Sequence, residues 1–100
     1  MTEPVNSAAA DVSIRNADFD AGAEIDKLRR AGVGAIATFS GIVRDNAEAP
    51  GLIAMTLEHF PGMTEQEIQN IVDQARRRWP LTAVKVIHRV GRLLPQANIV

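Results

Sequence analysis

The chain has 100 residues, of which 46% are hydrophobic and 23% charged, a composition typical of one soluble globular domain. The absence of cysteine excludes disulfide frameworks, thiolate zinc sites and cysteine nucleophiles. The sequence contains neither an apolar run of membrane-spanning length nor a secretory signal. We therefore expect a cytoplasmic protein that does not associate with membranes.

Charge is unevenly distributed along the chain although the net charge is only −1. Acidic residues gather in residues 1–26, and residues 74–100 contain six basic residues and no acidic one. This segregation indicates either an anionic partner for the basic end or an acidic segment folded beside it. Charge alone favours the second explanation.

The N-terminal quarter of the sequence predicts a tail, a strand and a helix. Residues 1–11 are small and polar, so we expect a disordered tail. Residues 12–15 alternate between apolar and polar side chains, which predicts a short strand. A helix over residues 21–31 follows, capped by Asp20 at its start and ended by Gly32.

The middle of the sequence predicts a pair of strands. Residues 34–43 form a dense apolar run with β-branched and aromatic members, which favours a buried strand with a bulge at Gly41. Arg44 ends this run and opens a loop over residues 44–51. Residues 52–60 predict the next strand, and we expect the two strands to pair as a hairpin.

A second helix follows the turn at Pro61 and Gly62. Thr64 and Glu67 match a capping box, and Pro80 stops the helix. Three arginines at residues 76–78 suit the negative end of the helix dipole. The predicted apolar face consists of Ile68, Ile71, Val72, Ala75 and Trp79.

The last segment predicts a strand over residues 82–89, a turn from Gly91 to Pro95 and the opening of a further strand at residues 98–100. The resulting β-α-β-β-α-β order with an antiparallel-type sheet predicts an α+β fold, and on pattern alone a ferredoxin-like arrangement. We expect one α+β domain over residues 12–100.

Few side chains suggest chemistry by themselves. His59 and His88 are too few for a metal site, and we interpret His59 as a core or interface residue and His88 as a solvated or anion-binding one. The arginines at residues 76–78 do not indicate a nucleic-acid partner, because the helix dipole already explains them. Arg44, at the end of a strand, is either a solvated arginine or a bidentate site for phosphate or carboxylate.

Three stretches of the sequence together resemble one known family. They are FSGIVRDN (39–46), LEHFPGMTEQEI (57–68) and RRRWPLTAVKVIHRVGRLLP (76–95). In this order and spacing they resemble the large, catalytic subunit of molybdopterin synthase, and the likeness covers residues 12–100. The resemblance implies an α/β-hammerhead fold, which shares the predicted β-α-β-β-α-β start and adds further strands and a helix.

The resemblance also implies an activity and partners. The large subunit would form a homodimer, and each copy would bind a small ubiquitin-like sulfur-carrier subunit that ends in a thiocarboxylate. Sulfur is then transferred twice to cyclic pyranopterin monophosphate, which gives molybdopterin in molybdenum cofactor biosynthesis without a metal or another cofactor. Ile42, Val43 and Arg44 match the family's substrate-contacting stretch, where Arg44 would hold the pterin phosphate or the incoming carboxyl terminus.

The sequence departs from the family pattern towards its end. The family's later histidine-arginine pair, its catalytic lysine and its P-x-W-K-type motif have no counterpart, and Lys27 and Lys85 do not match those positions. The turn at residues 96–98 lacks the usual glycine-acid pair. We therefore expect a C-terminally incomplete sulfurtransferase chain that holds no catalytic residue and is inactive alone.

Two alternatives stay open. One is a non-catalytic α+β ligand-binding or interaction module on the same scaffold. The other is a ferredoxin-like regulatory domain, which would require strand 82–89 to lie beside strand 12–15 with no hammerhead extension.

Overall fold

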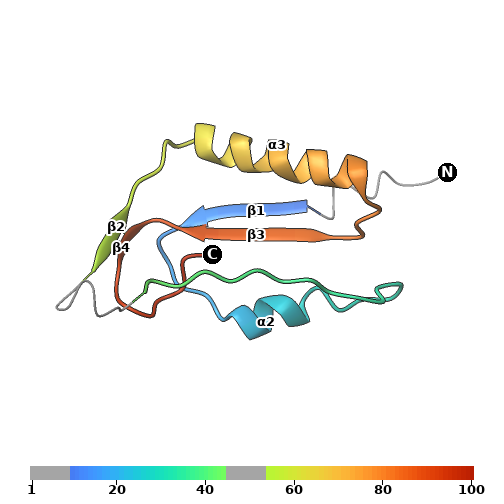
Figure 1. The fold of residues 1–100 in the computed structure, drawn as a ribbon, viewed down its shortest axis with the longest axis horizontal. Coiled ribbons are helices and arrows are strands. Elements are labelled where there is room, and N and C mark those ends of the chain that lie inside the picture. Colours follow the sequence, from blue (N-terminus) through green and yellow to red (C-terminus); the bar gives the residue numbers. More distant parts are fainter. Residues whose placement is uncertain (1–9, 45–53) are drawn as a thin grey trace.

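The computed structural model describes residues 10–44 and 54–100, and it confirms the predicted α+β class. The helix α3 lies along the pair of strands β1 and β3, and α2 lies on the other side of this pair (Figure 1). The elements in chain order are β1 (Ala10–Arg15), α2 (Ala21–Asp26), β2 (Met55–Leu57), α3 (Met63–Arg78), β3 (Val84–Arg89) and β4 (Gly91–Leu93).

The central strand pair is parallel, not antiparallel as expected. β1 pairs with β3 in a register that runs from Ala10 opposite Val84 to Arg15 opposite Arg89. A parallel pair needs a long crossover, and here α2, β2 and α3 all lie between the two strands in sequence. β1 starts at Ala10, so the last two residues of the predicted tail belong to the strand, and residues 1–9 lie outside the described residues.

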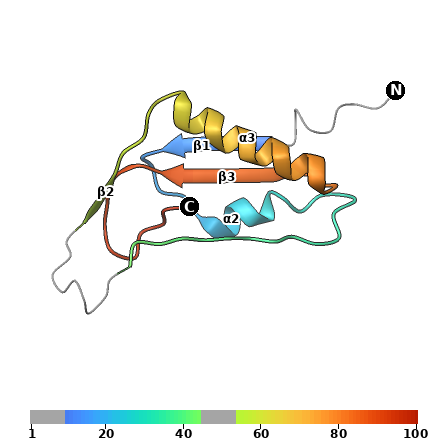
Figure 2. The same ribbon diagram turned by 45° about the horizontal axis from the view of Figure 1, so that its top comes forward.

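The second strand pair corrects the predicted hairpin. β2 pairs antiparallel with β4, with Met55 opposite Leu93 and Leu57 opposite Gly91. The first three residues of the predicted turn from Gly91 to Pro95 therefore form a strand, and the turn itself follows at residues 95–96. This β2–β4 ribbon lies beyond one end of the β1–β3 pair (Figure 2). The strands predicted at residues 12–15 and 82–89 do lie side by side, as the ferredoxin-like alternative requires, but the ribbon is an addition that this alternative leaves out.

Residues 34–43, predicted to be a buried strand, form no strand. The chain is extended there, but the only bridge it makes with residues that the structure describes joins Ile42 to Asn98 in antiparallel orientation. A strand is defined by its neighbour, and residues 34–40 have no hydrogen-bonded neighbour in the described part of the chain. The predicted loop 44–51 beyond Arg44, and the first two residues of the predicted strand 52–60, lie outside the described residues.

The first helix is shorter than predicted. The Asp20 carboxylate accepts a hydrogen bond of 3.1 Å from the Ala23 N–H, as the sequence predicts for a cap. Regular α-helical structure ends at Asp26, and the backbone then closes tighter turns, from the Leu28 N–H to the Ile25 carbonyl at 3.0 Å. The helix therefore covers six residues instead of the predicted range 21–31.

The second helix ends where the sequence predicts and begins earlier. α3 ends at Arg78, but it starts at Met63, because Gly62 adopts a φ of 83° that residues with a side chain rarely adopt. The Glu65 carboxylate accepts a hydrogen bond of 3.1 Å from the Gly62 N–H. Thr64 therefore lies inside the helix, where its hydroxyl accepts a bond from the Phe60 N–H instead of capping Glu67.

The core is small, and its buried side chains come from α3, β3, β4, Val90 and the end of the extended segment. Only Val72 of the predicted apolar face of α3 is buried, whereas Ile71 and Trp79 are 64% and 52% exposed. No helix among the described residues is long and apolar enough to cross a bilayer. The buried hydrophobic residues are Val43, Val72, Ile87, Val90 and Leu93.

Candidate anion-binding site

The three residues predicted to contact substrate, Ile42, Val43 and Arg44, lie at the end of the extended segment. Val43 is buried to 1% exposure, as is Leu93 of β4. Ile42 and Arg44 are exposed, because neighbouring residues of an extended chain point to opposite sides. Val43 therefore anchors this segment in the core, and its two neighbours present their side chains to solvent.

The backbone on both sides of Val43 is held by the C-terminal segment. The Val43 N–H donates to the Ala97 carbonyl at 2.9 Å, and the Gln96 N–H donates to the Val43 carbonyl at 2.7 Å. The bridge between Ile42 and Asn98 continues this pairing. The path of residues 41–43 is thus fixed before the chain reaches Arg44.

The Arg44 side chain makes no hydrogen bond or ion pair within residues 10–44 and 54–100. A guanidinium carries five N–H donors in a planar fork that matches the oxygens of phosphate or carboxylate. Because Val43 anchors the neighbouring backbone, the Arg44 guanidinium extends from a chain segment whose path is fixed. Chemically, this arrangement suits an exposed site for an oxyanion.

A second arginine, Arg89 of β3, is mostly buried and organises the backbone that supports the site. Its Nε and Nη2 donate to the Asn16 carbonyl at 3.1 and 2.9 Å, and its Nη1 donates to the Asn98 carbonyl at 3.2 Å. Asn98 in turn donates from Nδ2 to the Phe19 carbonyl at 2.9 Å. Arg89 therefore joins the end of β1, the end of β3 and the segment that pairs with Ile42.

Asp18 completes this network. Its carboxylate accepts hydrogen bonds from Asn98 Nδ2 at 3.0 Å and from the Phe19 N–H at 2.8 Å, and it lies 3.7 Å from Arg89 Nη1. The Asn98 hydrogen bond is the largest cause of a lowered pKa for Asp18, followed by the Phe19 N–H and the charge of Arg89. The sequence patterns do not predict this network, although Arg89 belongs to the stretch of residues 76–95 that resembles the family.

The turn before Asn98 contains a strained residue. Gln96 has a φ of 68°, the only positive value for a non-glycine residue in the described ranges. The left-handed region favours glycine. The family usually has a glycine-acid pair at this turn. This chain departs from that pattern at Gln96, the residue whose φ favours glycine, and the Gln96 N–H donates to the Val43 carbonyl.

The two lysines of the chain take part in a separate charge cluster. Lys85 lies 3.2 Å from both Asp11 and Glu24, and Lys27 lies 3.0 Å from Glu24. Burial by itself lowers the pKa of Lys85, but hydrogen bonds to Glu24 and Asp11 outweigh it and leave the pKa raised. The hydrogen bond from Lys27 is the largest cause of the lowered pKa of Glu24. Both lysines are thus paired with carboxylates, which fits a structural role.

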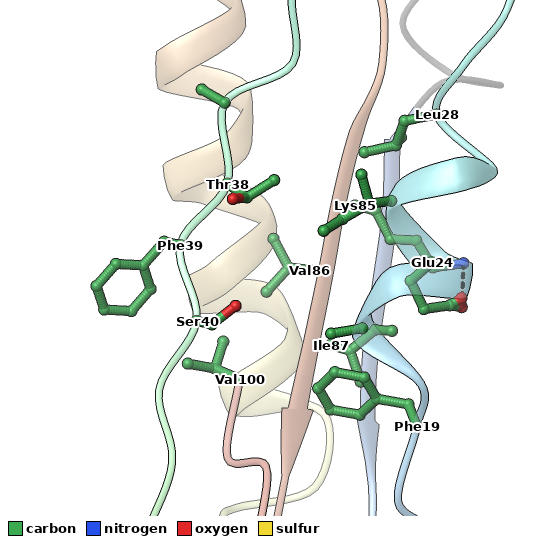
Figure 3. A pocket seen from close by; sticks show the side chains of 13 residues that line it. Phe19, Glu24, Leu28, Thr38, Phe39, Ser40, Lys85, Val86, Ile87 and Val100 are labelled. Atoms are coloured by element: carbon green, nitrogen blue, oxygen red, sulfur yellow. Dashed lines mark ion pairs between the residues drawn. The ribbon is translucent and has the colours of Figure 1, made fainter.

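This charge cluster borders a cavity of about 290 Å³ between α2, β3 and the extended segment (Figure 3). Lys85 and Glu24 lie on one side, and Thr38 and Ser40 lie on the other. The Phe39 ring points away from the cavity and is 83% exposed. The cavity offers mostly apolar walls and no free charged group of its own.

The two histidines do not belong to the Arg44 site. His88 Nδ1 lies 2.8 Å from the Arg89 carbonyl, so this ring is tied to its own strand, and His59 is half-buried after β2. Among the described residues, no cluster of three or more histidine, aspartate or glutamate side chains could hold a metal ion. Within residues 10–44 and 54–100, the chemistry available at the site is therefore that of arginine and the backbone.

Comparison with known proteins gives one consistent result. The family model described as MoaE protein matches residues 14–100. The molybdopterin synthase catalytic subunit of Ralstonia nicotianae is 52% identical over 91 residues, which cover 89% of this chain and 52% of that protein. That of Escherichia coli is 54% identical over 67 residues, which cover 67% of this chain and 45% of the relative.

Solved structures agree with the sequence comparison. The molybdopterin biosynthesis MoaE protein from Burkholderia ambifaria superposes with a TM-score of 0.78 at 47% identity, covering 90% of this chain and 59% of that one. The molybdopterin cofactor biosynthesis protein E from Burkholderia multivorans gives a TM-score of 0.79 at 44% identity, covering 91% and 60%. The chain spans about half the length of the curated relatives it matches.

Proposed function

The chain belongs to the MoaE protein family, and from that membership we propose that it is the pterin-binding part of a molybdopterin synthase catalytic subunit. Its substrate is cyclic pyranopterin monophosphate, and the pathway is molybdenum cofactor biosynthesis. The stretch of Ile42, Val43 and Arg44 forms the contact with substrate, in which Ile42 and Arg44 offer exposed side chains and the buried Val43 holds the stretch in place. A second copy of the chain and the small sulfur-carrier subunit are its partners.

The observation that carries this proposal is the position of Arg44. Its side chain is exposed and has no partner in the described residues, whereas its neighbour Val43 is fully buried and bonded on both sides. The fixed backbone lowers the conformational entropy that Arg44 loses on binding an anion, and the remaining loss is that of its side chain. The pterin phosphate and the carboxyl terminus of the sulfur carrier are both anions of this kind.

Arg44 acts by charge and geometry. During sulfur transfer, negative charge develops on acyl or phosphate oxygens, and a guanidinium bound to these oxygens stabilises it. Arg44 does not supply a nucleophile or a proton, because arginine stays protonated. Ile42, exposed beside it, offers an apolar contact for the pterin ring.

Residues 1–100 bind substrate but do not complete sulfur transfer in this proposal. The two lysines are engaged with Glu24 and Asp11, and neither belongs to the segment around Arg44. A paired, charged lysine is a poor nucleophile and a poor proton shuttle at neutral pH. The lysines that the family uses have no counterpart in this sequence.

Binding is tested by calorimetric titration of the chain with cyclic pyranopterin monophosphate. Loss of a hydrogen bond to a charged group weakens binding about tenfold or more, so Arg44→Ala should raise the dissociation constant by that factor. The matched control is Arg77→Ala, an exposed arginine on α3, which should bind as the unchanged chain does. Equal affinity of the Arg44→Ala variant and the unchanged chain would contradict the proposed site.

Turnover is tested separately by adding the small subunit with its thiocarboxylate and assaying molybdopterin. We expect no product from residues 1–100 while pterin binding persists. Product formation would overturn the assignment of the chain as inactive alone. Failure to bind the pterin, in a chain that is folded by circular dichroism, would favour the non-catalytic interaction module instead.

A further inference from the structure

Residues 96–98 pair with the backbone that leads to Arg44. The Val43 N–H donates to the Ala97 carbonyl at 2.9 Å, and the Val43 carbonyl accepts a bond of 2.7 Å from the Gln96 N–H. Arg44 follows Val43 directly and has an exposed side chain. Whatever holds residues 96–98 in place therefore also holds the backbone from which the Arg44 guanidinium extends.

The Asn98 side chain ties this segment to the connection between β1 and α2. Its Nδ2 donates to the Phe19 carbonyl at 2.9 Å and to the Asp18 carboxylate at 3.0 Å, which uses both N–H donors of the amide. These two bonds, the Asn98 clamp, join residues that lie 79 and 80 positions apart in sequence. The backbone of Asn98 forms the antiparallel bridge with Ile42. One residue thus contacts the β1–α2 connection with its side chain and the Arg44 segment with its backbone.

Arg89 holds the same segment from β3. Its Nη1 donates to the Asn98 carbonyl at 3.2 Å, and its N–H donates to the Ile99 carbonyl at 2.7 Å. The Arg89 side chain is only 11% exposed, and hydrogen bonds from a charged donor are stronger than neutral ones. Asn98 is therefore held on two sides, by Arg89 at its carbonyl and by the clamp at its side chain.

The clamp depends on the amide of Asn98 and not on its size. An aspartate or glutamate at this position would offer only acceptors to the Phe19 carbonyl and the Asp18 carboxylate, which are acceptors themselves. Residues 96–98 also lie where this chain departs from the glycine-acid pair of the family. The resemblance to the family therefore assigns no role to the Asn98 side chain, and the role follows from its contacts.

We propose that Asn98 is a positioning residue for substrate binding, whose clamp to Asp18 and Phe19 fixes the backbone that carries Arg44. The inference rests on the proposed function, because Arg44 is the group that binds the anion. Asn98 does not touch the substrate. It limits the backbone conformations that Arg44 samples before the anion arrives, so that less conformational entropy is lost on binding.

The first experiment measures affinity for cyclic pyranopterin monophosphate by calorimetric titration of folded protein. Asn98→Leu keeps a similar side-chain volume and removes both donors. We expect its dissociation constant to rise roughly fivefold or more, which is what ordering one backbone residue on binding costs. The matched control is Asn70→Leu on α3, where the lost contact is a bond of 2.9 Å from Gln66 Nε2. Asn70→Leu should bind as the unchanged chain does.

A double-mutant cycle separates positioning from a general effect on the fold. The same Asn98→Leu substitution is made in the Arg44→Ala variant, and both dissociation constants are measured. If Asn98 acts through Arg44, it should weaken binding much less once the Arg44 side chain is gone. An equal loss of affinity in both backgrounds would overturn the positioning role.

The second experiment follows the clamp without any ligand, by amide hydrogen exchange in NMR. In Asn98→Leu, the Val43 N–H should exchange about tenfold faster or more, because its partner segment has lost two hydrogen bonds. The N–H of Val72, in the middle of α3, serves as the reference and should change little. Unchanged exchange at Val43, or equal acceleration at Val43 and Val72, would overturn a local clamp.

The two experiments distinguish this inference from the proposed function. If the unchanged chain binds no pterin, the proposed function fails and the role of Asn98 in binding fails with it. If the unchanged chain binds and Asn98→Leu binds equally well, only the role of Asn98 is overturned. Asn98→Ala, which removes the same donors without adding an apolar side chain, replaces Asn98→Leu in both experiments if the latter does not fold.

Discussion

Replacing Gln96 with glycine should stabilise the protein, although the change removes a whole side chain. Gln96 has a φ of 68°, and its side chain is exposed and makes no hydrogen bond in the described part of the chain. The left-handed conformation costs a residue with a Cβ about 1–2 kcal/mol. Glycine avoids this strain and keeps the 2.7 Å hydrogen bond from the N–H of residue 96 to the Val43 carbonyl.

The expected gain is smaller than the strain itself. Glycine loses about 0.5–1 kcal/mol more backbone entropy on folding than a residue with a side chain. The difference predicts a net stabilisation of Gln96→Gly by about 0.5–1 kcal/mol. For a domain of this size, that raises the midpoint of thermal unfolding by about 2–8 °C.

The assay is urea and thermal unfolding followed by circular dichroism, with two controls. Gln74→Gly makes the same substitution on the exposed side of α3, where φ is helical, and should destabilise by about 1 kcal/mol. Gln96→Ala keeps the Cβ and the strain, and should change stability little. If Gln96→Gly is neutral or destabilising while Gln74→Gly behaves as expected, the reasoning from φ is refuted.

Two further predictions concern the anchor and the acid-sensitive network. Val43→Ala deletes two fully buried methyl groups and should lower the free energy of unfolding in urea by about 2–3 kcal/mol. Ile42→Ala changes a side chain that is 54% exposed and should alter this free energy little. Similar losses of stability in the two variants would refute the anchor role of Val43. The Asn98 hydrogen bond lowers the pKa of Asp18 from 3.8, so its stabilising effect is present above pH 3.8 and is lost as pH falls through the lower folded-state value. Asp18→Asn should therefore flatten the fall in melting temperature below pH 4, while Asp26→Asn, in a pair whose side chains are both 72% exposed, should leave it unchanged. An unchanged acid profile in Asp18→Asn would contradict this role.

The sequence correctly predicts features that depend on interactions between neighbouring residues. Asp20 caps α2 because its carboxylate needs only the N–H three residues away, and α3 ends before Pro80 because proline supplies no N–H. The sequence predicts Arg44 at the end of an extended run, and in the structure Arg44 lies there with an exposed side chain. The helix begins earlier than the spacing of Thr64 and Glu67 predicts, because Gly62 adopts a positive φ that this spacing does not reveal.

Pairing between distant segments was not predictable in the same way. The apolar run that predicts a strand over residues 34–43 says nothing of which segment will pair with it, and in the described part of the chain only its last residues have a neighbour. The short strand from Gly91 contains a glycine and resembles a turn until its partner β2 is known. Arg89 was identified as part of a motif, but its partners Asn16 and Asn98 come from both ends of the chain.

The parallel pairing of β1 with β3 determines the order in which this fold can assemble. Arg89 and Asn16, at the joined ends of these strands, lie 73 residues apart in sequence. As the chain leaves the ribosome, α3 can form from contacts within itself, but β1 must wait until residues 84–89 have emerged. Closing a loop of that length comes before any of its contacts can stabilise it, which slows folding. β1, the strand that is synthesised first, is therefore among the last strands to be paired. Until then, its backbone must not form hydrogen bonds with other exposed strand edges.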